Sequence, residues 1–192
     1  MWCGGDGLRL KKHLQYKGLL LKHKNIVMSK FLSDDLKKYN IPHEILPICP
    51  TPIKNIKPHK KGKNIYIYAG TPGKGNFYGL DKVPEIKKKT GLNVIVAFYD
   101  SYTKEELLLI YKSCFIGLRL TPHDGLPNTV IEMGLLGRKC IYNGEIPTSI
   151  KWKDVDDICR IIKREYKKSD DTKKVHDEIY KYVNINKNWL KI

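Results

Sequence analysis

The sequence lacks several features that would place it in a class at once. No apolar run approaches the roughly 18 residues of a membrane-spanning helix, so the sequence predicts none. The opening segment, MWCGGDGLRLKKH, has charges with no apolar core after them, which is unlike a secretory signal peptide. No C-x-x-C pair occurs among the five cysteines, so we expect reduced thiols, no structural zinc and a cytoplasmic protein.

Arginine is scarce, although the chain is strongly basic. The formal net charge is +16, yet only five of the 36 basic residues are arginine. Proteins that recognise nucleic-acid bases favour the bidentate guanidinium group. Most of the excess charge lies in residues 1–63, which carry a net +10. The composition therefore disfavours specific nucleic-acid recognition. It leaves open a basic face for peripheral contact with an anionic membrane or substrate, and a compositional bias of the genome.

Short apolar strands alternate with helices along most of the chain. Strands are predicted over 24–29, 43–48, 64–70, 93–99, 114–120 and 139–143. Helices are predicted over 33–39, 79–90, 103–113, 128–136, 154–167 and 172–183, with Ser33 as the N-cap of the first. This alternation predicts an α/β fold, with a Rossmann-like parallel sheet, right-handed crossovers and flanking helices.

A segment rich in proline and lysine divides the chain. Residues 50–63, PTPIKNIKPHKKGK, are predicted to be a linker. We expect a partial N-terminal α/β segment at 1–49, a ligand-binding domain at 64–167, and a C-terminal helix and tail at 168–192. A complete doubly wound domain normally needs at least about 100 residues, so the part before the linker is predicted to be incomplete.

Two loops that follow predicted strands hold the candidate binding residues. Parallel sheets bind ligands beyond the carboxyl ends of their strands, so GTPGKGNFYG (70–79) and RLTPHDGLPNTVIEMGLLGRK (119–139) are expected to meet there. In the second loop, Gly125 allows close approach of the backbone, and Pro127 precedes a helix that Asn128 or Thr129 can cap. The first amides of such a helix attract a phosphate or another anion.

Two acids flank this helix start. Asp124 lies in the loop and Glu132 lies near the first helical turn. A carboxylate in either place accepts hydrogen bonds from vicinal hydroxyl groups, such as those of a ribose or another sugar. A nucleotide sugar presents ribose, diphosphate and sugar in that order. Two acids on either side of an amide-rich helix end therefore suit it.

The stretch HDGLPNTVIEMGLLGRK resembles the E-x7-E region of retaining, GT-B-fold glycosyltransferases of the family-4 type. Asp124 stands for the first Glu of that pattern and Glu132 for the second, while EMGLLGRKCIY matches the turn and strand that follow. The resemblance extends over about residues 24–165, where 24–48 is similar to the end of the family's N-terminal domain. It departs at Asp124, and at Gly70-Thr71, where the family usually has Gly-Arg.

The resemblance implies roles for the matching positions. Asp124 would contact the donor sugar, close to the backbone of Gly125 and Leu126, and Glu132 would hold the ribose of a UDP- or GDP-sugar. Lys74 would neutralise the leaving diphosphate, with Arg119 as a second cation. We count Asp124, Lys74 and Arg119 as the implied catalytic residues and the following as implied donor-binding residues: Gly70, Thr71, His123, Gly125, Leu126, Asn128, Thr129 and Glu132. The family needs no bound metal and no other cofactor.

Each residue also has an ordinary structural interpretation. Asp124 fits an Asp-Gly turn, Glu132 a first-turn acid, Lys74 a solvated lysine, Arg119 a structural ion pair, and His123 the end of a strand. Two other functions stay open: a non-catalytic nucleotide-sugar-binding or partner subunit, and a basic nucleic-acid-binding protein. The acceptor is unknown. A partner chain or a self-dimer is expected to complete the cleft, because the N-terminal segment is short.

Overall fold

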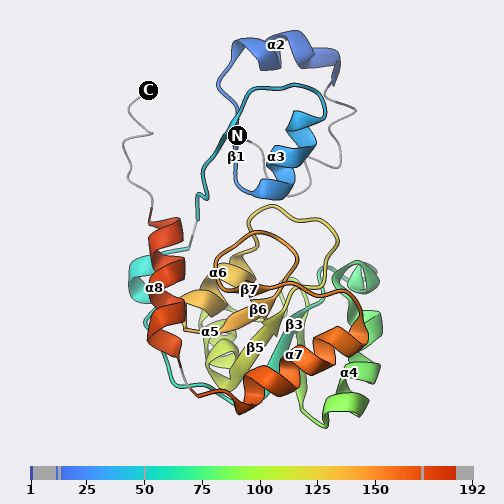
Figure 1. Ribbon diagram of the computed structural model, residues 1–192, viewed down its shortest axis with the longest axis vertical. Coiled ribbons are helices and arrows are strands. Elements are labelled where there is room, and N and C mark those ends of the chain that lie inside the picture. Colours follow the sequence, from blue (N-terminus) through green and yellow to red (C-terminus); the bar gives the residue numbers. More distant parts are fainter. Residues whose placement is uncertain (2–11, 13, 50, 170, 185–192) are drawn as a thin grey trace.

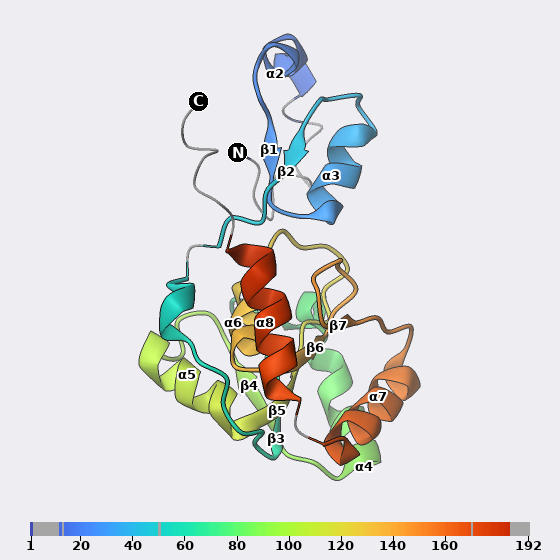
Figure 2. The same ribbon diagram turned by 60° about the vertical axis from the view of Figure 1, so that its left-hand side comes forward.

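The fold is that of a computed structural model, which describes residues 1, 12, 14–49, 51–169 and 171–184. A five-stranded sheet with helices on both faces forms the main body (Figures 1 and 2). A smaller N-terminal unit lies at one end of this body, above the loops that leave the sheet. The predicted fold class is confirmed: a Rossmann-like parallel sheet follows a short α/β segment.

All strand pairs of the main sheet are parallel. Its order is β4 (Val94–Ala97), β3 (Asn64–Tyr68), β5 (Cys114–Leu118), β6 (Lys139–Ile141) and β7 (Ser149–Ile150). Strand β7 was not predicted, because two half-buried residues leave no pattern. From β3 the chain adds β4 on one side and then β5 on the other, so β3 and β5 form the topological switch point. Open α/β sheets bind ligands at such a point.

Two apolar layers enclose the sheet (Figure 2). Helices α4 (Val83–Thr90) and α7 (Val155–Lys167) cover one face, and α5 (Lys104–Ser113), α6 (Asn128–Leu135) and α8 (Thr172–Val183) cover the other. Thr103 and Glu106 form a reciprocal capping box at α5, and Asp154 caps α7. The predicted helix over 79–90 begins later, because two 3-10 turns, Gly75–Tyr78 and Leu80–Lys82, precede α4.

The N-terminal unit has its own small core. It contains a 3-10 turn (Leu14–Tyr16), α2 (Lys17–Lys22), β1 (Ile26–Val27), α3 (Lys30–Lys37) and β2 (Glu44–Ile45), and β1 pairs with β2 in parallel. Val27, Leu32, Leu36 and Ile41 are buried together. In the described part of this unit, two strands of two residues each accompany this small core.

The predicted N-cap of α3 is wrong. Ser29 caps the helix, since its Oγ accepts a hydrogen bond from the N–H of Leu32 at 3.4 Å. Ser33 lies inside the helix instead, with its Oγ 2.8 Å from Nε2 of His43. The helix begins early because Leu32 and Leu36, one turn apart, are both fully buried, and this face must already be helical at Leu32.

The linker lies against the main body over most of its length. Arg138 is fully buried and donates hydrogen bonds to the carbonyls of His59 at 2.7 Å and Lys60 at 2.6 Å. It also donates to the carbonyl of Cys114, at the start of β5, at 2.8 Å. A Cβ at Gly62 would meet the backbone of Ser113 at 2.0 Å, so only glycine fits there. One guanidinium therefore fastens the linker to the central strand.

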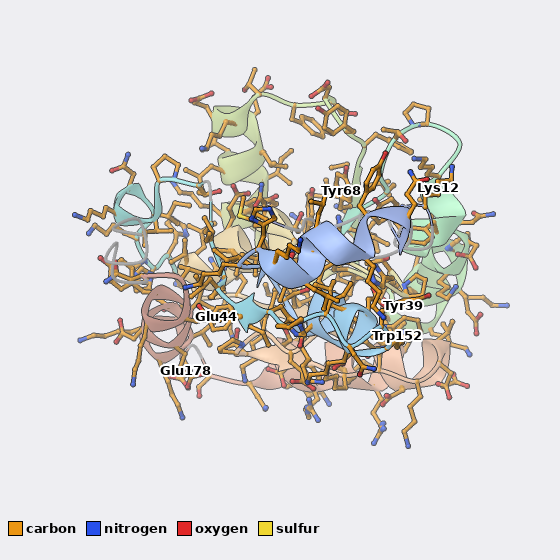
Figure 3. All side chains as sticks on the ribbon, turned by 90° about the horizontal axis from the view of Figure 1, so that it is seen from above. Lys12, Tyr39, Glu44, Tyr68, Trp152 and Glu178 are labelled. Carbon is orange, nitrogen blue, oxygen red and sulfur yellow. The ribbon has the colours of Figure 1, made fainter. Side chains whose placement is uncertain are left out.

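Charged side chains are distributed around the molecule. Seen from above, side chains that end in nitrogen project outward on all sides (Figure 3). No helix in the described ranges is long and apolar enough to cross a membrane. Of the cysteines, Cys49, Cys114, Cys140 and Cys159 are free thiols, and Cys3 lies outside the described residues.

We expect Arg138→Leu to lower the free energy of unfolding by about 3 kcal/mol, because the carbonyls that Arg138 bonds lose a charged donor. Urea unfolding followed by circular dichroism measures this difference. Arg160→Leu is the matched control, because the Arg160 side chain is 79% exposed. Equal losses in the two variants would contradict the role of Arg138 as a fastener.

Candidate functional site

A cleft of about 400 Å³ opens at the switch point of the sheet. Its lining comes from β3, the loop after β4, helix α5, the loop after β5 and the first part of α6. The residues are Tyr66, Tyr68, Phe98, Tyr99, Asp100, Tyr102, Leu107, Tyr111, Arg119, Asp124, Leu126, Pro127, Asn128, Thr129 and Glu132. The structure thus brings together Asp124, Arg119 and Glu132, three of the predicted site residues, in the place where such sheets bind ligands.

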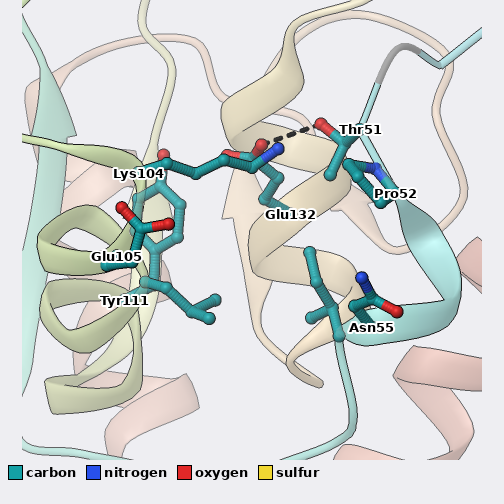
Figure 4. Close-up of a pocket in the computed structure, with 9 residues that line it drawn as sticks. Thr51, Pro52, Asn55, Lys104, Glu105, Tyr111 and Glu132 are labelled. Atoms are coloured by element: carbon teal, nitrogen blue, oxygen red, sulfur yellow. Dashed lines mark hydrogen bonds between the residues drawn. The ribbon is translucent and has the colours of Figure 1, made fainter.

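Glu132 lies between this cleft and a smaller cavity of about 280 Å³. Its Oε1 accepts a hydrogen bond from Oγ1 of Thr51 in the linker at 2.8 Å. Figure 4 shows Lys104 of α5 and Thr51 approaching the carboxylate from different sides. Burial raises the pKa of Glu132 above its ordinary value, against the opposing effects of Thr51, Lys104 and Tyr111. The sequence did not reveal these partners, because they lie far from Glu132 along the chain.

Asp124 and Arg119 form an ion pair in the wall of the cleft. Oδ2 of Asp124 lies 2.7 Å from Nε and 2.6 Å from Nη2 of Arg119. Oδ1 of Asp124 accepts the backbone N–H of Gly125 at 2.8 Å. Both side chains are mostly buried, at 9% exposed for Arg119 and 15% for Asp124. The alternative interpretation of Arg119, that it forms a structural ion pair, agrees with these contacts. Both members of the pair also line the cleft.

Two tyrosines hold the guanidinium of Arg119. Its carbon lies 4.5 Å from the ring centre of Tyr68 and 4.7 Å from that of Tyr78, distances typical of cation–π contacts. Gly70 explains the position of Tyr78. It has a positive φ of 71°, and a Cβ there would meet the Tyr78 ring at 2.2 Å. Gly70 therefore serves the site by packing against Tyr78.

The start of α6 differs from the prediction in its cap. Pro127 occupies the N-cap position without a side-chain cap bond, so neither Asn128 nor Thr129 caps the helix. The helix begins at Asn128, and both residues already belong to its first turn. The N–H groups of Val130 and Ile131 donate to the carbonyl of Pro127. In the described part of the chain the amides of Asn128 and Thr129 have no such partner, and both residues line the cleft.

The N-terminal unit touches the loop that carries Asp124. Nε2 of His123 lies 2.7 Å from Oδ2 of Asp35 in α3, and the His123 ring lies 5.6 Å from that of Phe31. The hydroxyl of Ser29 donates to the backbone carbonyl of Asp124 at 3.4 Å. The predicted site residue His123 thus joins the two parts of the protein beside the cleft.

Five predicted site residues do not line the cleft: Gly70, Thr71, Lys74, His123 and Gly125. Among them, Lys74 and Thr71 belong to the loop after β3. Lys74 is exposed and its N–H closes a turn with the carbonyl of Thr71. The sequence reasoning also missed three exposed rings after β4: Phe98, Tyr99 and Tyr102, which are 36%, 60% and 40% exposed. The cluster FYDSY at the end of a predicted strand was the signal that could have identified them.

The described residues contain no group of three His, Cys, Asp or Glu side chains arranged to hold a metal ion. Among the residues lining the cleft, Arg119 is the one basic side chain, beside Asp100, Asp124 and Glu132. The polar chemistry of the cleft is therefore that of carboxylates, helix-start amides and one guanidinium held on aromatic rings.

We expect Glu132→Gln to raise the free energy of unfolding at pH 7. The raised pKa means that the folded state binds the proton of Glu132 more tightly than the unfolded state does. Ionisation of Glu132 therefore lowers the free energy of unfolding, and the loss is complete above the pKa of the folded state. This advantage should disappear as the pH falls below the ordinary carboxyl value of 4.5, where both states are protonated. Thermal unfolding between pH 3.5 and pH 8, scanned at about half-unit steps, tests this window.

Glu105→Gln is the control for this effect. Glu105 lies on the neighbouring helix α5, and its side chain is exposed to solvent. An advantage of Glu132→Gln that is constant with pH would contradict the assignment to ionisation.

Comparisons with known proteins find relatives by structure alone. No family model and no curated protein matches the sequence. The fold is similar to that of sucrose-phosphate synthase from Thermosynechococcus elongatus, with a TM-score of 0.67 and 12% identity over 90% of this chain and 58% of that one. It is also similar to S. aureus TarM, in a structure with UDP, with a TM-score of 0.62 and 13% identity over 86% of this chain and 43% of that one.

A third similar structure is the pneumococcal O-GlcNAc transferase GtfA in complex with UDP and GlcNAc. The TM-score is 0.57 and the identity 12%, over 88% of this chain and 44% of that one. The chain thus spans roughly half the length of the structures that it resembles. At these identities the likeness concerns the fold. The chain has the fold of GT-B glycosyltransferases.

Proposed function

We propose that this protein binds a nucleotide sugar in the cleft and transfers the sugar to an acceptor with retention of configuration. The observation that carries the proposal is the arrangement at the switch point. Asp124 and Glu132 lie on either side of the first turn of α6, with Arg119 beside them. These groups follow the order of the parts of a nucleotide sugar. Asp124 corresponds to the sugar, the amides of α6 with Arg119 to the diphosphate, and Glu132 to the ribose. The structures of TarM and GtfA in complex with UDP support a nucleotide ligand for this fold.

Each part of the donor has a matching group in the cleft. Glu132 accepts hydrogen bonds from the ribose hydroxyls, and the first amides of α6 with Arg119 receive the diphosphate. Asp124 contacts the sugar. The rings of Tyr99 and Tyr102 offer faces on which a uracil or guanine base stacks. The donor is therefore a UDP- or GDP-sugar, with Asp124 and Arg119 as the catalytic groups.

Transfer of the sugar requires stabilisation of the leaving group, the nucleoside diphosphate. As the bond from the anomeric carbon to the phosphate oxygen breaks, negative charge builds on the departing diphosphate. Arg119 and the start of α6 offset this charge, so the reaction has no need of a metal ion. Lys74 stands on the loop after β3 and remains a proposed second cation, reaching the phosphates if that loop closes over the donor.

The acceptor side of the cleft is small in this chain. The N-terminal unit has two strands of two residues each, and the chain spans 43–58% of the length of the similar structures. We propose that a partner chain, a second copy or a further part of a longer polypeptide completes the cleft for an acceptor. The same observation favours the second candidate function, a non-catalytic nucleotide-sugar-binding subunit.

The surface of the N-terminal unit suits a membrane better than a nucleic acid. Tyr16, Leu19 and Leu21 on and beside α2 are 52%, 56% and 48% exposed, and Lys17 and Lys22 flank them. Apolar side chains among lysines fit peripheral contact with an anionic membrane from the cytoplasmic side. Such contact would bring the cleft near an acceptor carried by the membrane.

We expect calorimetric titration with a panel of UDP- and GDP-sugars to show binding of one of them. Glu132→Ala should weaken that binding by about 1–3 kcal/mol, because charge-assisted hydrogen bonds to the ribose are lost. Glu178→Ala, an exposed acid on α8, is the control and should bind as the wild type does. Unchanged affinity for the nucleoside diphosphate in Glu132→Ala would contradict the ribose assignment.

We also expect the isolated chain to bind its donor but to transfer the sugar slowly. Release of nucleoside diphosphate with added acceptors should increase when a partner chain, or a self-dimer seen by light scattering, completes the cleft. Efficient transfer by a preparation shown to be monomeric would contradict this expectation.

A further inference from the structure

Arg119 and Asp124 form an ion pair with each other in the cleft that we assign to the donor. Both contacts of the guanidinium, through Nε and Nη2, go to the same carboxylate oxygen of Asp124. The two tyrosine rings hold the guanidinium in place, so it has little room to move away from the carboxylate. The charge of Arg119 is thereby already compensated.

This pairing conflicts with the binding of a diphosphate. The cleft-lining residues within the described ranges carry three carboxylates, Asp100, Asp124 and Glu132, and one cation, Arg119. A diphosphate that binds beside an intact pair would lie close to the carboxylate of Asp124, and like charges at such a distance repel. The amides at the start of α6 contribute only partial charges.

From this conflict we infer that the donor's diphosphate replaces Asp124 as the partner of Arg119, and that Asp124 then turns to a hydroxyl of the donor sugar. The inference rests on the proposed function. It adds an explanation of how the cleft distinguishes the donor from a free nucleoside diphosphate. The guanidinium can stay on its tyrosines, because only the carboxylate has to rotate. Oδ1 of Asp124 is bonded to the N–H of its own neighbour Gly125, a local contact that a change of side-chain rotamer can replace.

Through this exchange, Asp124 favours binding of the nucleotide sugar over binding of the product, the nucleoside diphosphate. With a nucleotide sugar, the displaced carboxylate gains a sugar hydroxyl as a new partner. A free nucleoside diphosphate offers no hydroxyl there, so Asp124 competes with it for Arg119. The pair therefore favours the binding of the intact donor and promotes release of the nucleoside diphosphate after transfer.

The test compares Asp124→Asn with a matched variant, Asp100→Asn. Both remove one negative charge from the cleft. Among the described residues, however, the ion pair of Arg119 is with Asp124 and not with Asp100, and asparagine tolerates the positive φ of 58° at position 100. Asp124→Asn should bind free UDP or GDP about tenfold more tightly than the wild type, whereas Asp100→Asn should stay within about twofold. The preference of Asp124→Asn for the nucleotide sugar over the free diphosphate should fall by at least about tenfold.

Unchanged or weaker binding of the free diphosphate by Asp124→Asn would overturn the inference. Equal tightening in the two variants would also overturn it, since general charge would then be the cause. If the wild type binds nucleotide sugars while Asp124→Asn gives either result, the proposed function stands and only the exchange fails. If the wild type binds no nucleotide or nucleotide sugar at all, the proposed function fails, and the exchange with it.

A crystal structure of the wild type with UDP or GDP provides a second test that is independent of how well the variants fold. The exchange predicts phosphate oxygens at hydrogen-bonding distance from Nε and Nη2 of Arg119, with the Asp124 carboxylate turned away. A pair still at 2.6–2.7 Å beside the bound diphosphate would overturn the inference.

Discussion

The ion pair between Arg119 and Asp124 connects the parts of this structure on which the site depends. Arg119 follows β5, and Tyr68 at the end of β3 supports its guanidinium from the neighbouring strand. Asp124 sets the course of the loop between β5 and α6 through its bond to the N–H of Gly125. The contact of Arg119 with Tyr68 thus connects β5 to β3 across the switch point of the sheet. A buried pair of this kind needs close geometry to offset the loss of hydration, which explains the two tyrosines and Gly70.

Contacts with the N-terminal unit meet the same loop from the other side. His123 contacts Asp35, and Ser29 contacts the carbonyl of Asp124. A small unit with two short strands is therefore held at the edge of the cleft and has a defined orientation there. The linker contributes through Arg138 at one end and through Thr51, which bonds Glu132, near the other. Contacts from the N-terminal unit and from the linker thus reach both acids of the site.

The charges also explain why a strongly basic chain has an acidic cleft. The excess of lysine lies on the outside, where solvent hydrates it at little cost. Inside the cleft, two of the three carboxylates have a defined partner: Arg119 for Asp124 and Thr51 for Glu132. Burial raises the pKa of Glu132, so we expect its ionised form to lower the stability of the fold. Residues kept under such strain are common at functional sites.

The sequence by itself determined the order and type of the elements, because strand and helix periodicity, caps such as Thr103 and turns such as Asp124-Gly125 are local properties. It also predicted Asp124, Glu132 and Arg119 as site residues, beside a glycine turn and a strand end, and all three line the cleft. It misplaced the cap of α3 at Ser33 and missed two short elements, α2 and β7, which carry no clear pattern of buried residues. Only the tertiary structure paired Arg119 with Asp124, brought Thr51 to Glu132 across 81 positions, and placed Lys74 outside the cleft lining. Such contacts depend on how the loops pack after the sheet has formed, and local sequence does not encode them.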